Sequence, residues 1–156
     1  MSHSTTASVL VAILACAFTG QSACAQAAET PREIEVVAND YTFLPLPTSI
    51  SAGPTLFSFL NQGKVQHELS IARLKAGVSL DDFSNATKSA VDAPRRREMF
   101  ERSVGILIAG PGKAPDGRLL VNLQKGATYV VFCNLKDTPD APGHLTFGMY
   151  TAFSAK

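Results

Sequence analysis

The chain has 156 residues, which is enough for one domain with a real hydrophobic core but not for two domains of ordinary size. Hydrophobic residues make up 46% of the chain, charged residues 17%, and the formal net charge is +1. Because nucleic-acid binding relies on a concentrated excess of Lys and Arg, this balance argues against a nucleic-acid partner.

The first 25 residues have the layout of a cleavable export signal. Residues 9–18 form an apolar run that is too short to cross a bilayer as a helix. Small residues at 23–25, and again at 25–27, provide an A-x-A site for cleavage near Ala25 or Ala27. We therefore expect residues 1–25 to be a signal peptide and the mature protein, which has no membrane span, to be periplasmic or otherwise exported. Lipid attachment at Cys16 or Cys24 is the less favoured alternative.

Cleavage at this site changes the cysteine count. Cys16 and Cys24 leave with the signal peptide, so the mature domain keeps Cys133 alone and forms no internal disulfide. Taken alone, such a cysteine is commonly a small buried hydrophobic residue. The residues near Cys133 in the sequence therefore have to show whether it is a packing residue or a metal ligand.

Short strands and turns alternate through the first half of the mature chain. Segments rich in β-branched and aromatic residues predict strands at residues 34–38, 41–43, 55–60 and 68–74. Gly and Asn-Asp pairs between them are turn signals. In the last of these strands Leu69, Ile71 and Arg73 share one face, and His67 lies at its start, where a loop leads into the sheet.

The middle of the chain is helical in character. Ser79 followed by Asp82 forms a capping box, and apolar residues at helical spacing predict a helix over residues 80–90. Pro94 suits the first turn of a second short helix that runs through Arg102. We expect its arginines at 95–97 to form a solvated face, with a docking site for an acidic partner as the alternative.

The final third returns to strands. They are predicted at residues 119–123, 128–133 and 146–153, after an apolar segment at 104–109. Seven or eight short strands with Gly and Pro turns and one helical excursion predict an all-β fold, an antiparallel β-sandwich or barrel.

Four side chains in this framework carry metal-binding chemistry: His67, Cys133, His144 and Met149. They use both histidines and the only cysteine of the mature chain. Cys133 ends a buried strand, and His144 and Met149 flank the start of the next, so all four are expected at one end of the sandwich. A thiolate, two imidazoles and a thioether are the ligand set of a blue-copper electron-transfer site. Singly, each His and Met is more often a packing or surface residue, but the combination favours one copper ion that cycles between Cu(I) and Cu(II).

The same residues carry a family resemblance. Residues 57–63 leading to His67-Glu68, then 129–133, His144 and Gly148-Met149, resemble the cupredoxins of the plastocyanin and azurin type. The resemblance covers residues 34–153 and implies a Greek-key β-sandwich over residues 33–156 that shuttles electrons in the periplasm. It also implies that His67, Cys133, His144 and Met149 are the copper ligands.

Three features depart from that resemblance. The ten residues 134–143 between Cys133 and His144 make a longer loop than in the small soluble members. Residue 68 is Glu where plastocyanin-like proteins often have Asn, and the helical segment at residues 80–102 is an insertion.

These observations predict an exported, monomeric one-electron carrier that is not an enzyme, with a redox partner protein that the sequence does not identify. The alternative is a non-redox copper-handling protein for storage or delivery, or an interaction domain of the same fold that has lost its metal. An enzyme is disfavoured because a second copper centre needs further histidines and no nucleophile motif is present.

Overall fold

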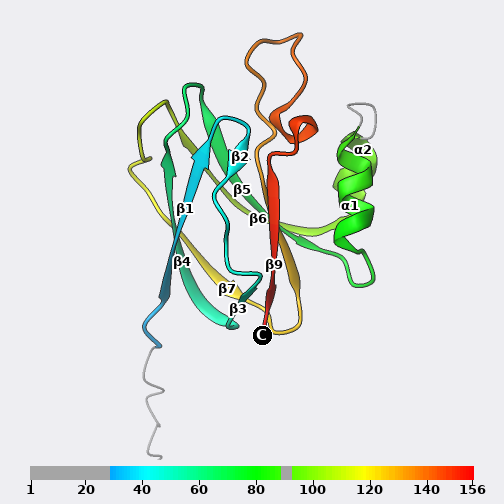
Figure 1. The fold of residues 1–156 in the computed structure, drawn as a ribbon. Helices are drawn as coiled ribbons and strands as arrows, with labels where there is room; N and C mark the ends of the chain where they lie inside the picture. Colours follow the sequence, from blue (N-terminus) through cyan, green and yellow to red (C-terminus); the bar gives the residue numbers. More distant parts are fainter. Residues whose placement is uncertain (1–28, 89–92) are drawn as a thin grey trace, which may run out of the picture.

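Two β-sheets pack face to face in the computed structural model, which describes residues 29–88 and 93–156 (Figure 1). One sheet has the strand order β2-β1-β4-β7 and the other the order β3-β9-β8-β5-β6. The strands are β1 (Arg32–Asn39), β2 (Thr42–Phe43), β3 (Ser49–Ile50), β4 (Gly53–Asn61), β5 (His67–Leu74), β6 (Phe100–Ala109), β7 (Leu119–Leu123), β8 (Thr128–Phe132) and β9 (Tyr150–Ala155). The predicted signal peptide lies outside the described residues. Among those described, no helix is long and apolar enough to span a bilayer.

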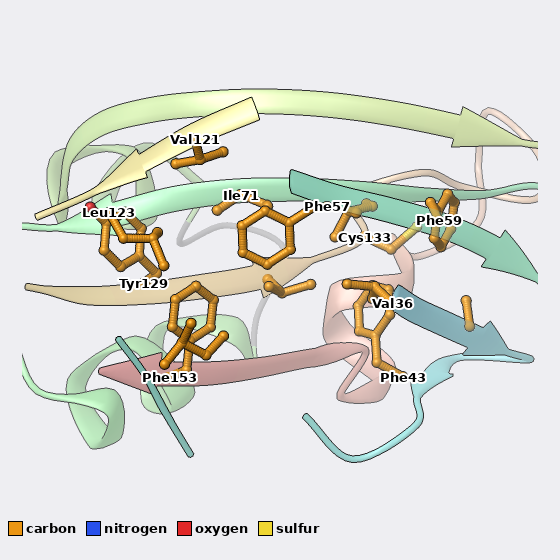
Figure 2. Packing of buried hydrophobic residues seen from close by; sticks show 14 of the residues in the cluster. Val36, Phe43, Phe57, Phe59, Ile71, Val121, Leu123, Tyr129, Cys133 and Phe153 are labelled. Carbon is orange, nitrogen blue, oxygen red and sulfur yellow. The ribbon is translucent and has the colours of Figure 1, made fainter. Parts of the chain in front are cut away.

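The core lies between the sheets and is built from alternate residues of each strand. In β4, for example, Phe57 and Phe59 are buried while their neighbours are partly exposed. The rings of Tyr129 and Phe57 each stack on Phe153, at centroid distances of 5.3 and 6.0 Å. Burying each such side chain stabilises the fold by about 1.5–3 kcal/mol. Cys133 belongs to this same core cluster, in which Figure 2 shows it close to Phe59.

The predicted β-sandwich is confirmed, but its sheets are mixed rather than purely antiparallel. β1 runs parallel to β4, and the short β3 runs parallel to β9. After β1 and β2 the chain crosses to the second sheet at β3 and returns as β4, so β1 and β4 meet in the same direction. The crossover residues 44–48 carry Pro45 and Pro47, which cannot continue a ladder of backbone hydrogen bonds.

Two short helices cover the outer face of the five-stranded sheet (Figure 1). The predicted capping box begins α1 (Leu80–Thr87): the Ser79 hydroxyl accepts from the backbone N–H of Asp82, whose carboxylate accepts from the N–H of Ser79. Phe83 packs from this helix onto Leu74 and Val130 in a second core cluster. Because core covers both of its faces, β5 is buried at nearly every position.

Several predicted boundaries were wrong. The first helix ends at Thr87, before residues 89–92, which are not described, and α2 (Ala93–Glu98) ends before Arg102 because Phe100 already pairs with β5. Arg96 is also buried rather than solvated, and it donates to the carbonyl of Ala86.

The last predicted strand begins too early. Residues 144–147 form a 3-10 helix, η2 (His144–Phe147), and β9 starts only at Tyr150. Gly148 ends η2 with a φ of 90°, a left-handed conformation that favours glycine.

Candidate metal centre

Three neighbouring strands bring the four predicted ligands to one end of the sandwich. His67 is the first residue of β5, Cys133 directly follows β8, and Met149 directly precedes β9. These strands are adjacent in the order β9-β8-β5. His144 begins η2, between β8 and β9, and its carbonyl accepts from the backbone N–H of Met149.

The sulfur and two imidazole nitrogens form a tight triangle. The Sγ of Cys133 lies 3.3 Å from Nδ1 of His144 and 3.9 Å from Nδ1 of His67, and the two Nδ1 atoms are 3.1 Å apart. All three side chains are buried, with exposures of 1% or less. Met149 is fully buried in the same core cluster as Cys133, and its carbonyl accepts from the Cys133 N–H.

Burial sets the protonation of this triangle. Desolvation raises the pKa of the Cys133 thiol to about 11, despite a hydrogen bond to its sulfur from the backbone N–H of Glu68. Desolvation, and then the neighbouring His144, lower the pKa of His67. Without a metal, the site at neutral pH therefore holds a thiol and a neutral His67.

Asp137 fixes the orientation of His144. Its Oδ1 lies 3.0 Å from the Nε2 of His144, and its Oδ2 accepts a 2.5 Å hydrogen bond from the hydroxyl of Tyr41. A carboxylate only accepts, so Nε2 carries the proton and the Nδ1 lone pair points toward Cys133. The hydrogen bond from Tyr41 is also the main reason that the pKa of Asp137 is lowered.

Tyr41 closes the outer side of the triangle. Its ring makes edge contacts with His67, His144 and Phe147, at centroid distances of 6.1, 5.0 and 5.1 Å. Its φ of 58° is the one positive value of a non-glycine residue in the described chain, and such backbone strain persists only where surrounding contacts hold it. The contacts over the imidazoles supply that restraint.

The loop before His67 is rigidly held. Asn61 is fully buried and its amide donates to the carbonyls of Val65 and Ala109. A Cβ on Gly63 would approach Oδ1 of Asp40 to 2.6 Å and Nε2 of His67 to 3.0 Å, so only glycine lets this loop pack against the imidazole. The loop therefore positions the His67 ring closely.

Glu68 ties the loop after Cys133 to β5. Its carboxylate accepts from the backbone N–H of Asn134 at 2.8 Å and from the hydroxyl of Ser70 at 3.1 Å. Glu68 thus makes two hydrogen bonds at the site. Its carboxylate accepts from the residue after Cys133, and its backbone N–H donates to the sulfur. Glu68 as a whole residue is only 8% exposed, so a nearly buried carboxylate lies beside the site.

The donor triangle fits a single ion. A trigonal ion with bonds to nitrogen and sulfur of about 2.0 and 2.3 Å separates its donor atoms by roughly 3.5–3.8 Å. The observed separations of 3.1–3.9 Å require little movement to reach that arrangement. The nitrogens, the sulfur and a buried Met are also the donor types that suit copper in both oxidation states.

An unpartnered atom supports the same fit. Because Nδ1 of His144 faces inward without a proton, Nδ1 of His67 is the donor in their contact, which leaves its Nε2 unprotonated. That Nε2 is buried without a hydrogen-bond partner in the described residues, and the Asp40 carboxylate is 3.9 Å away. A metal at Nδ1 would shift the proton to Nε2, where it would face Asp40.

The structure brings the predicted His67, Cys133 and His144 together and places Met149 in the same core cluster as Cys133. Sequence reasoning missed Tyr41, Asp137 and the role of Glu68. Asp137 lies in a polar loop without periodicity, and its bond to Tyr41 spans 96 positions. The Asn39-Asp40 turn signal beside a tyrosine was the only local sign of Tyr41.

Comparisons with solved structures identify the fold. Auracyanin from Roseiflexus castenholzii aligns with a TM-score of 0.52 and 16% identity over 82% of this chain and 99% of its own. Auracyanin B aligns with a TM-score of 0.54 and 19% identity over 82% of this chain and 91% of its own. Auracyanin A from Chloroflexus aurantiacus, a "blue" copper protein, aligns with a TM-score of 0.51 and 16% identity over 81% of this chain and 100% of its own.

These neighbours are cupredoxins, so the chain has the cupredoxin fold and the resemblance seen in its sequence is confirmed at the level of the fold. No protein-family model matches the chain, and no curated protein matches it.

Proposed function

We propose that this chain is an exported type 1 copper protein that transfers single electrons through His67, Cys133, His144 and Met149. The observation that carries the proposal is the buried triangle of one sulfur and two Nδ1 atoms within 3.9 Å of each other. Bound copper would supply the one-electron couple, because thiolate and thioether suit Cu(I) and imidazole suits both states.

The residues around the triangle hold the donor atoms in place and shield them from solvent. Strands β5 and β8 and the hydrogen bonds of Asn61 and Glu68 hold the donors in place, so they need to move little when the charge of the site changes. Tyr41, at an edge contact with the buried His144, and Phe147, which is 54% exposed, lie between the imidazole and solvent. An electron therefore has a short route out while water is kept from the sulfur.

Cyclic voltammetry of the copper-loaded protein tests the electron-transfer role against the second candidate, copper storage or delivery. A carrier gives a reversible one-electron wave that keeps its amplitude over many cycles. The long loop at residues 134–143 is anchored through Asp137, and this favours retention. Loss of copper into a Cu(I) chelator during each reduction would favour delivery instead.

Copper binding should release about one proton per site at pH 7–8. The thiol of Cys133, with its pKa of about 11, must lose its proton, whereas His67, whose pKa is lowered, only moves its proton from Nδ1 to Nε2. The apparent affinity should accordingly rise about tenfold per pH unit below pH 11. Calorimetry of Cu(II) binding in buffers with different ionisation enthalpies counts the protons, and a value near zero would contradict a thiolate ligand.

Replacing Met149 with leucine should keep copper bound and raise the reduction potential. A long axial sulfur contact contributes little affinity but donates charge to the oxidised site, and leucine fills similar volume without a donor. Met99→Leu is the matched control, because Met99 is buried in the other core cluster. Equal potentials for the two variants would remove Met149 from the ligand set.

Export is the second part of the proposal. The apolar run at residues 9–18, the cleavage site near Ala25 and the lone remaining cysteine support it. Mass spectrometry of the protein recovered from expressing cells should give a mature N-terminus near residue 26 or 28. An intact Met1, or a lipid on Cys16 or Cys24, would contradict simple cleavage.

A further inference from the structure

A cavity of about 490 Å³ opens between the two sheets where their edge strands β6 and β7 face each other. Its polar lining consists of Arg73, Arg102, Asn122, Gln124 and Tyr129. Arg73 follows His67 by six positions along β5, which corresponds to about 20 Å at ~3.3 Å per residue. Figure 2 likewise shows Tyr129 at the end of the core away from Cys133 and Phe59. The cavity is therefore separate from the candidate metal centre.

Two arginines stand side by side in this cavity. Arg73 continues the row of Leu69 and Ile71, two fully buried residues, on the face of β5 that points between the sheets. In the strand register it lies directly opposite Arg102 of β6. Like charges directly opposite each other destabilise a sheet, and a hydrophobic residue at position 73 would extend the core. Glu101 offsets part of this repulsion through its ion pair with Arg73, and an anion bound between the two guanidinium groups would offset more of it.

The guanidinium of Arg73 is incompletely paired. One of its terminal nitrogens, Nη2, bonds to Glu101 at 2.7 Å, but its Nε is buried and has no hydrogen-bond partner in the described residues. Arg102 forms no ion pair within this part of the chain. A buried unsatisfied donor is rare in a native protein and calls for an explanation such as a ligand.

The surroundings are cationic. A second cavity, of about 310 Å³, shares Arg73 and Gln124 with the first and adds Lys75 and Lys125. Among the residues that the structure describes, Glu101 is the only acidic one that lines either cavity. Four cations against one carboxylate attract an anion, and two amide side chains offer further donors to it.

We propose that this cleft binds a small organic or inorganic oxyanion of the phosphate or carboxylate class, with two or more negative charges. An anion between Arg73 and Arg102 would relieve their repulsion, and a small shift of the Arg73 side chain would let the buried Nε donate to it as well, since a guanidinium edge matches a carboxylate or phosphate in a bidentate manner. The volume is that of a site for a small molecule rather than a single halide ion.

Calorimetric titration of the full chain with pyrophosphate, citrate and chloride tests this inference. Pyrophosphate or citrate should bind saturably with a stoichiometry of one in moderate salt, and which of the two binds more tightly identifies phosphate or carboxylate as the preferred class. Chloride at equal ionic strength should give no saturable heat. NMR shifts should be concentrated at residues 73, 102, 122 and 124.

Arg102→Gln should weaken oxyanion binding about tenfold or more, because it removes a charge-assisted hydrogen bond. Arg102 is exposed, so this variant should fold normally. Arg118→Gln is the matched control, since this exposed arginine pairs with Glu33 outside the cleft. Arg73→Lys keeps the positive charge but removes the planar guanidinium with its paired N–H donors, so it should weaken binding as well.

Absence of saturable binding, or equal weakening by Arg102→Gln and Arg118→Gln, would overturn the proposal. The inference is independent of the copper site. Cys133→Ser should leave oxyanion binding unchanged, so failure of one proposal can be told from failure of the other.

Discussion

Replacing Cys133 with serine should abolish the intense visible colour of the copper-loaded protein and weaken Cu(II) binding by about a hundredfold or more. The colour requires charge transfer from a thiolate, and a serine hydroxyl is not deprotonated at neutral pH. If Cys133, His67 and His144 supply similar shares of the roughly 10–16 kcal/mol that structural zinc sites reach, loss of the thiolate costs at least this factor. Absorption spectroscopy and competition with a chelator measure the two effects.

The serine variant should still fold. Its hydroxyl has nearly the shape of the thiol and can accept the same hydrogen bond from the N–H of Glu68, so the free energy of unfolding should fall by only about 1–2 kcal/mol. Urea unfolding of both metal-free proteins checks this. A stable variant that keeps the colour would show that another group supplies the thiolate-like band, which would rule out Cys133 as the ligand.

Replacing Asp137 with asparagine should raise the reduction potential by about 60–120 mV. The carboxylate stabilises positive charge on His144 through its 3.0 Å contact with Nε2, and the oxidised site carries one more positive charge than the reduced one. Loss of such a partner typically lowers metal affinity 10–100-fold. If that loss falls on Cu(II), each factor of ten corresponds to about 59 mV for a one-electron couple.

Asp140→Asn is the matched control for this prediction. Asp140 lies in the same loop and is exposed, so its substitution makes the same charge change where solvent screens it. Tyr41→Phe tests the hydrogen bond that holds Asp137 in turn, because it removes the hydroxyl that donates to Asp137 but keeps the ring over the imidazoles. Equal shifts for Asp137→Asn and Asp140→Asn would mean that only bulk charge matters and that the contact with His144 does not.

The strands and the donor set were predictable because their signals are local. The β-branched run before Cys133 and the alternation around Phe57 predict β8 and β4 directly, and Ser79 with Asp82 marks the start of α1. Two histidines, one cysteine and a methionine at strand ends need no knowledge of the complete fold to suggest a common site.

The rest depends on contacts between distant residues. The parallel pairing of β1 with β4 follows from a crossover that Pro45 and Pro47 permit but do not specify. The η2 segment alternates like a strand, and only the glycines on either side of it, Gly143 and Gly148, indicate a turn. Asp137 reaches His144 because its loop folds back over the site, which polar composition alone does not reveal.

The visible absorption spectrum of the wild-type chain after addition of one equivalent of Cu(II) tests the central claim most directly. A site built from His67, Cys133 and His144 should develop an intense blue or green colour that saturates at one copper per chain and is lost reversibly on reduction. A colourless protein that retains no copper would contradict it and leave a cupredoxin fold without a metal.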